Sequence, residues 1–392
     1  MKELGKRINR EKILKWLTIC LLIYSLLSVY KGCEKGMAQS KDFQWDSAKL
    51  LAMRINPYEE SLHPTGVLEQ YDFGGDYGKL EANQFPSLLW LLLPFTFFAP
   101  GMANILWTIF NLICVILFLI CLRKTFLNDL SKEEYFFTVA VFLSGTPLRN
   151  CLAMGQHTLF SVAFLMLAIY MAQKEKHMAA GLFLSLSYFK YVLIVPMALY
   201  FIYKRWFKEI MISVIPHIIL TVFSAWWLES SFMDMILQPL AISAKLVDKG
   251  EIDLGRWIGN GNLAMLIAVL LGISLMVFVF FVPKGYDKEV ITLLTLVTLI
   301  LMYHRFYDFL VLVVPMALLL FREGSSRFEK AAISVAVCLS YYAVSVIIHL
   351  WEIYGTEYNI LLAVLAVFYY ALIGVELYRM VRIVIKEHSK TD

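Results

Sequence analysis

Charged residues are scarce in this chain of 392 residues, at 17% of the sequence, whereas 60% of it is hydrophobic. A water-soluble domain would contain about 25% charged residues. Apolar runs recur along the whole length, and no polar stretch between them is long enough to bury a core of its own. This deficit argues against a soluble enzyme and predicts an all-α, polytopic integral membrane protein.

Signatures of several other function classes are also missing. The sequence contains no Walker motif, no dinucleotide-binding fingerprint, no HExxH and no DxD. A cytoplasmic site for ATP or a nucleotide sugar is therefore not supported, and we expect no cofactor and no bound metal. The six cysteines form no CxxC pair, which leaves only a Cys33–Cys151 disulfide open. The formal charge of +4 gives no reason to expect nucleic acid as a partner.

Basic clusters predict the topology. Five basic residues precede the first apolar run, which keeps this end cytoplasmic and makes 13–30 a retained signal anchor. Later basic clusters alternate with connections poor in Lys and Arg. Placing the clusters inside predicts a single membrane-embedded domain over 1–392, with about twelve spans and both termini cytoplasmic. The spans are expected at 13–30, 102–122, 133–148, 157–173, 177–189, 191–203, 209–228, 262–282, 289–302, 305–321, 329–350 and 358–382.

Two large loops then lie outside an inner (plasma) membrane, at 31–101 and 229–261. In the first loop we predict an amphipathic helix over 42–54, stopped by Asn56-Pro57. We also predict a short juxtamembrane helix over 86–98, because a full crossing there would put the basic residues that follow on the wrong side.

The predicted helix 42–54 carries two carboxylates, Asp42 and Asp46, one helical turn apart and so on one face. A carboxylate at the outer surface can act as a general base on a sugar hydroxyl. The alternative for Asp42 is a plain N-cap near the positive end of the helix dipole.

Two further polar points lie at the same predicted face. Gln156 and His157 follow Gly155 at the start of the span 157–173. In this position Gln156 can bind a hydroxyl or a phosphate. The alternative is that the motif only starts a helix. Lys190 lies between two short apolar spans. It either snorkels to the interface or faces a cavity as a phosphate ligand.

The densest polar stretch is Tyr303–Asp308. Asp308 lies one turn from His304 and can orient it, or can pair with Arg305. The guanidinium of Arg305 suits bidentate contact with a phosphate, as does that of Arg149. The alternative is a charge cluster that pairs with itself in a turn.

The order and spacing of these motifs resemble the family 87 glycosyltransferases, polytopic enzymes of GT-C type that are similar to bacterial polyprenol-phosphate-mannose-dependent mannosyltransferases. Three positions depart from the family pattern: Ser87 replaces a proline, Arg54 stands where glycine is expected, and Tyr191 follows Lys190 in place of proline. The motifs that carry the resemblance are Asp42-Phe43, Asn56-Pro57-Tyr58, Phe85-Pro86, Gly155-Gln156, Ala180-Gly181, Lys190 and Tyr303–Asp308.

The resemblance implies transfer of a mannose-like hexose, with inversion, from a polyprenyl-phosphate donor to a cell-envelope glycan or glycolipid at the outer face. Asp42 would be the base, and the substrate-binding residues would be Asp46, Arg149, Gln156, His157, Lys190, His304, Arg305 and Asp308. A transporter or flippase of lipid-linked sugars is the alternative, although no internal repeat is visible. A ligase or polymerase of envelope glycans is a third possibility, which would need a larger late outer loop with paired arginines.

Overall fold

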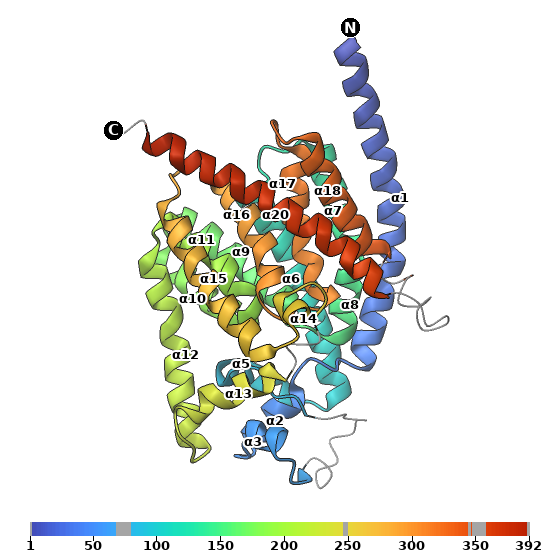
Figure 1. The fold of residues 1–392 in the computed structure, drawn as a ribbon. Coiled ribbons are helices and arrows are strands. Elements are labelled where there is room, and N and C mark those ends of the chain that lie inside the picture. The colour runs from blue at the N-terminus through green and yellow to red at the C-terminus, as the bar shows by residue number, and fades with distance from the viewer. Residues whose placement is uncertain (1, 68–79, 246–249, 344–345, 347–357, 390–392) are drawn as a thin grey trace.

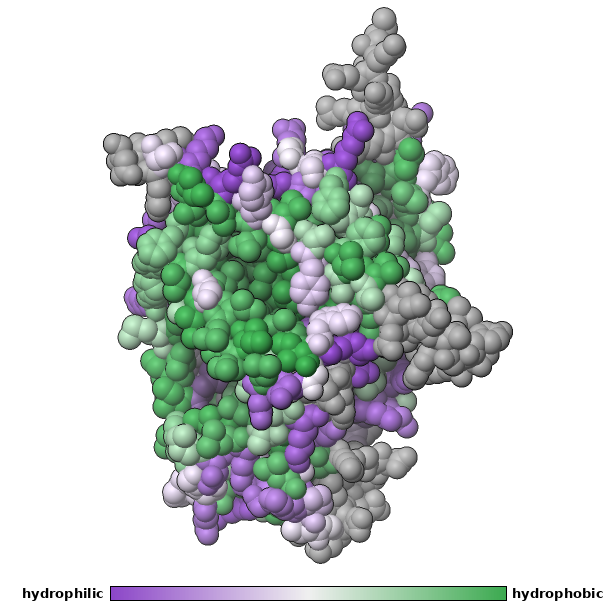
Figure 2. All heavy atoms as spheres, in the orientation of Figure 1, coloured by the Kyte–Doolittle hydropathy of each residue, from purple (hydrophilic) through white to green (hydrophobic). Residues whose placement is uncertain are grey.

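The computed structural model describes residues 2–67, 80–245, 250–343, 346 and 358–389. Within these ranges every regular element is a helix, and Figure 1 shows the long ones packed into one bundle. Figure 2 shows an apolar band between hydrophilic rims at the top and bottom of the view. The all-α membrane fold predicted from the sequence is confirmed.

The first half of the chain forms a long entry helix, a set of short helices at one end of the bundle, and then bundle helices. These elements are α1 (Lys2–Ala38), α2 (Trp45–Ala52), α3 (Pro57–Leu62), α5 (Pro86–Leu92), η1 (Leu93–Phe97), α6 (Pro100–Thr125), α7 (Lys132–Ser144), α8 (Thr146–Met154), α9 (Thr158–Gln173), α10 (His177–Ser187), η2 (Tyr188–Lys190) and α11 (Tyr191–Lys204).

The second half adds the remaining bundle helices and two short helices within 229–261. These elements are α12 (Phe207–Trp227), α13 (Asp234–Ala244), α14 (Leu254–Ile258), α15 (Gly261–Phe281), α16 (Asp287–Leu301), η4 (Phe306–Leu312), α17 (Val313–Phe321), α18 (Arg327–Cys338), the π-helical turn η5 (Leu339–Ala343) and α20 (Tyr358–His388).

By length and composition, six described helices can cross a membrane, or seven if the bent pair α7–α8 is one span. The predicted count of about twelve is therefore not confirmed. Helices α7 and α8 meet at 48° around Gly145, whose backbone is extended. The predicted span 133–148 is therefore broken at this residue. The residues after it, which were predicted to form a polar connection, form the helix α8. The end of the predicted span 329–350 lies outside the described residues.

The stretch His177–Lys204 counts as one span by length, but its contacts show that it turns back on itself. His177 Nδ1 lies 2.5 Å from Glu209 Oε1 in the first turn of α12, and Lys204 stands only five residues before Glu209. A straight helix of this length would separate its ends by about 40 Å, whereas five residues reach at most about 18 Å. Helices α10 and α11 are therefore the arms of a hairpin with η2 at its apex, as the two short predicted spans require.

The structure of 31–101 differs in detail from the prediction for the first outer loop. Helix α2 begins at Trp45, because Gln44 adopts a left-handed backbone with φ 64°. Asp42 therefore precedes the helix, and the prediction that it shares a helical face with Asp46 is wrong. Asn56 does not merely stop a helix, since its side chain accepts hydrogen bonds from Tyr58 N and Glu59 N and caps α3.

Two other expectations for this loop can be compared with the structure. The predicted helix 86–98 is present as α5 followed by η1. Arg54, at the position where glycine was expected, has a left-handed φ of 62°. Its guanidinium lies 4.1 Å from the ring centre of Trp227, a cation–π contact that helps to hold a backbone conformation which glycine adopts more easily.

Helices α1 and α8 pack with their backbones nearly in contact. A Cβ on Gly32 would lie 2.9 Å from the carbonyl oxygen of Arg149, and a Cβ on Gly36 would lie 2.3 Å from that of Leu152. Two glycines one turn apart are the usual means by which membrane helices approach this closely. The last turns of α1 are thereby held against α8. Cys33 and Cys151, near this contact, are both free thiols.

Candidate active site

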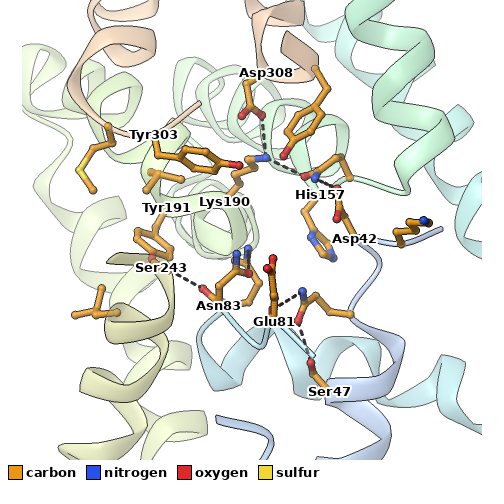
Figure 3. A pocket seen from close by; sticks show the side chains of 18 of the residues that line it. Asp42, Ser47, Glu81, Asn83, His157, Lys190, Tyr191, Ser243, Tyr303 and Asp308 are labelled. Atoms are coloured by element: carbon orange, nitrogen blue, oxygen red, sulfur yellow. Dashed lines mark hydrogen bonds and ion pairs between the residues drawn. The ribbon is translucent and has the colours of Figure 1, made fainter. Parts of the chain in front are cut away.

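Two cavities lie next to each other, and Tyr307 lines both of them. The first, about 330 Å³, is called the acidic cavity below, and Figure 3 shows most of the side chains that line it. The second, about 470 Å³, is called the basic cavity and is lined by residues of α1, α8 and 305–307, with Glu251. The acidic cavity gathers most of the candidates from sequence: Asp42, Asp46, Gln156, His157, Lys190 and Asp308.

Asp42 is held at the acidic cavity by the junction between α8 and α9. Its backbone N–H donates to the carbonyl oxygen of Met154 at 2.9 Å. Gly155, which ends α8, has a φ of 67°, and a Cβ there would lie 2.6 Å from Cβ of Ser40. Both the backbone angle and the missing side chain therefore require glycine. This close approach brings Asp42 beside Gln156.

A continuous polar chain runs from Asp308 to Asp42. Lys190 Nζ lies 2.8 Å from Asp308 Oδ1 and 2.9 Å from Gln156 Oε1, and Gln156 Nε2 donates to Asp42 Oδ2. An ammonium group can only donate, so the amide oxygen of Gln156 must face Lys190 and its NH₂ must face Asp42. Gln156 thus occupies one oxygen of the Asp42 carboxylate, and Asp42 lines the cavity.

Asp308 is held by further polar contacts around it. Thr158 Oγ1 donates to Asp308 Oδ1 at 2.6 Å, and His304 Nδ1 lies 3.2 Å from Oδ2. The other ring nitrogen of His304 donates to the carbonyl oxygen of Thr298 at 3.0 Å. His304 is 1% exposed and lines neither cavity, so it supports Asp308 from behind, and the predicted direct contact with substrate is not supported.

Lys190 does not snorkel. Its side chain is buried at the apex of the α10–α11 hairpin, 8% exposed, with Nζ 4.6 Å from the ring centre of Tyr307. Because Asp308 already neutralises its charge, Lys190 is better suited to hold Gln156 than to bind a phosphate.

Burial shifts the acid strength of two carboxyl groups in the acidic cavity. Burial raises the pKa of Asp42, and the carboxylate of Glu81 raises it further, whereas the hydrogen bond from Gln156 and the charge of Lys190 lower it. Burial also raises the pKa of Asp46 to about 7. A carboxylate with a raised pKa is a stronger base at neutral pH.

Several residues that line the acidic cavity were missed by sequence reasoning. The most prominent belong to the short polar run Glu81–Gln84, whose position directly before the apolar helix α5 was the available signal. Tyr303 and Tyr307 belong to the dense stretch noted in the sequence but were not selected. The other missed lining residues with polar side chains are Lys41, Gln44, Ser47, Tyr191 and Ser243.

The basic cavity contains Arg149 and Arg305, which the structure separates from Lys190. Lys31 and Lys35, one turn apart at the end of α1, complete a group of four cations, and Glu251 Oε1 lies 3.4 Å from Arg305 Nε. The two lysines were missed, although they break the positive-inside rule at the end of the first span that is predicted to lie outside. Within the described parts of the chain, no group of three His, Cys, Asp or Glu side chains could hold a metal ion.

Comparison with known proteins gives a single result. The chain matches the family model of glycosyltransferase family 87 over residues 86–315, which is more than half of its length. The chain belongs to glycosyltransferase family 87. No curated protein and no solved structure matches it.

Membership of family 87 makes this protein a membrane glycosyltransferase, which acts on a sugar donor and an acceptor. The range matched by the family 87 model contains Gln156, Lys190 and Asp308. Asp42 and Asp46 precede it, so their place in the site comes from the structure, in which Asp42 closes the polar chain that begins at Asp308.

Proposed function

We propose that the protein transfers a hexose from a polyprenyl-phosphate sugar to a hydroxyl of a cell-envelope glycan or glycolipid, at the outer face of the plasma membrane, with Asp42 as the general base. The observation that carries this proposal is the pair of adjoining cavities with opposite charge. One contains a buried carboxylate suited to take a proton, and the other contains cations suited to a phosphate.

The charges of the two cavities support this division. With Lys190 paired to Asp308, the acidic and basic side chains left around the acidic cavity, apart from His157, are Asp42, Asp46 and Glu81 against Lys41. The basic cavity has Glu251 against Lys31, Lys35, Arg149 and Arg305. Arginine and lysine are the side chains that bind phosphate oxygens in proteins. The donor phosphate accordingly binds in the basic cavity, and its sugar passes Tyr307 into the acidic cavity.

The reaction then follows from this placement. Asp42 takes the proton of the acceptor hydroxyl as its oxygen forms a bond to the anomeric carbon. The bond between that carbon and the phosphate oxygen breaks, and its electron pair leaves with the polyprenyl phosphate. The cations stabilise the negative charge that grows on the phosphate in the transition state. Attack from the side opposite the leaving group inverts the anomeric carbon.

Gln156 and Lys190 act as positioning residues in this scheme. Lys190 fixes the rotamer of Gln156, and Gln156 holds one oxygen of Asp42, so that the second oxygen faces the acceptor. Pre-set orientation of a reacting group contributes to catalysis because less freedom is lost on reaching the transition state.

The decisive experiment replaces Asp42 in the purified protein. Asp42→Asn keeps the shape but cannot accept the proton, so we expect transfer from a polyprenyl-phosphate hexose to fall about 10²–10⁴-fold while donor binding is retained. In the unaltered protein, kcat/KM should fall as the pH is lowered through the raised pKa of Asp42, because the protonated carboxyl is not a base. Transfer is measured with labelled donor, and donor binding by equilibrium titration.

Glu229→Gln is the matched control, since this exposed carboxylate lies outside both cavities. Unchanged transfer by Asp42→Asn would rule out Asp42 as the base. Movement of the lipid-linked sugar across a vesicle membrane without transfer would instead favour the transporter interpretation.

A further inference from the structure

One part of the acidic cavity, called its mouth below, is lined by three segments that are far apart in the sequence: α2, residues 80–84 and α13. Gln44 Nε2 donates to the carbonyl oxygen of Glu81 at 2.9 Å, which ties residues 80–84 to the start of α2. On the other side, Ser243 Oγ on α13 donates to the carbonyl oxygen of Asn83 at 3.2 Å. Residues 80–84 are therefore held from both sides.

Carboxylate oxygens face into this mouth. In Figure 3 the carboxylate of Glu81 points away from its own segment into the cavity, toward the side occupied by His157 and Asp42. Asp46 also lines the cavity, and its Oδ1 is buried with no hydrogen-bond partner among the described residues. A buried polar atom without a partner is costly unless a ligand or water satisfies it.

We propose that this mouth is the acceptor subsite, and that Glu81 and Asp46 select an acceptor sugar bearing hydroxyl or amino groups and exclude one bearing phosphate or carboxylate. The proposal rests on the proposed function and specifies the chemical class of its second substrate.

The physical basis is the difference between hydroxyl and anionic groups beside carboxylates. Carboxylate oxygens accept hydrogen bonds from hydroxyl and ammonium donors, and the mouth supplies such oxygens at Glu81 and Asp46. A second negative charge placed there meets like charges, which lowers affinity for the wrong partner. The donor phosphate is unaffected, because it binds in the basic cavity.

The test compares acceptors that differ in one group. The full-length purified protein and a short-chain polyprenyl-phosphate hexose are combined with an alkyl hexoside, its 2-amino analogue, its 6-phosphate and its uronic acid. We expect transfer to the neutral and amino acceptors, with kcat/KM about 100-fold lower for the two anionic ones. In Glu81→Gln the ratio of kcat/KM for neutral acceptors to kcat/KM for anionic acceptors should be about tenfold smaller, whereas the control Glu229→Gln should leave this ratio unchanged.

The outcomes separate the two proposals. Transfer to anionic and neutral acceptors at equal rates would overturn the acceptor subsite while leaving the glycosyltransferase reaction in place. Discrimination unchanged in both Glu81→Gln and Asp46→Asn would also overturn it. Transfer to no acceptor at all would overturn the proposed function and this inference with it. Glu81→Asp keeps the negative charge and should keep the discrimination between neutral and anionic acceptors. It therefore shows whether a loss of discrimination in Glu81→Gln comes from the missing charge or from misfolding.

Discussion

Lys190 and Asp308 show how a charge can be kept inside an apolar bundle. Their side chains are both almost fully buried, and Nζ of Lys190 lies 2.8 Å from Oδ1 of Asp308. The sequence located Lys190 between two short apolar helices. It could not show which group the ammonium faces, because its partners Gln156 and Asp308 come from other parts of the chain.

Removing both charges together should cost less stability than the sum of the losses from removing each alone. Lys190→Met leaves Asp308 buried without its main counter-charge, and we expect the free energy of unfolding to fall by about 3–5 kcal/mol. Lys190→Met combined with Asp308→Leu should lose less than the sum of the two single changes. Unfolding in detergent, followed by denaturant titration, measures the cycle. Additive losses would show that the pair is not coupled.

At the scale of elements, apolar periodicity predicted the helices of the bundle and both arms of the α10–α11 hairpin. It failed at the start of α2, because nothing in the sequence announces the left-handed backbone of Gln44. Asn56-Pro57 was interpreted as a stop, yet the same pair of residue types also starts a helix by capping it. The contact between α1 and α8 was not predicted, because Gly32 and Gly36 reveal their role only once α8 lies against them.

The α1–α8 contact should tolerate no added side chain at Gly36. Gly36→Leu would push the carbonyl oxygen of Leu152 away and displace Lys31 and Lys35 from Arg149. We therefore expect the affinity for the donor to weaken at least about tenfold. The free energy of unfolding should fall by about 1–3 kcal/mol. Gly272→Ala in α15 is the control, because nothing lies within 4 Å of its added Cβ. Donor titration and thermal unfolding provide the readouts. Unchanged donor affinity in Gly36→Leu would separate the basic cavity from this helix contact.

At the scale of the whole molecule, the positive-inside rule gives an orientation in the membrane that stays a prediction. In Figure 1 the N- and C-terminal ends of the chain lie toward one end of the bundle, and α2, α3 and α13 lie at the other. The sequence could indicate that the polar candidates share a face. It could not show their division into two cavities, which depends on contacts such as that of Asp42 with the α8–α9 junction.

The orientation is tested by labelling single cysteines in a cysteine-free background. Ser230→Cys, just after α12, should react with a membrane-impermeant maleimide in intact cells, and Lys284→Cys, between α15 and α16, should react only after permeabilisation. Labelling of both in detergent is the control for reactivity. The reverse pattern would place the acidic cavity on the cytoplasmic side.

The shared wall at Tyr307 also affects the order of events during turnover. The residues that line the basic cavity come from α1, α8 and 305–307, with Glu251, whereas α2, residues 80–84 and α13 contribute to the acidic cavity alone. In the proposed reaction the donor phosphate and the acceptor therefore occupy different cavities. We expect the two substrates to bind in either order, and the spent lipid carrier to leave while the lengthened glycan is still bound.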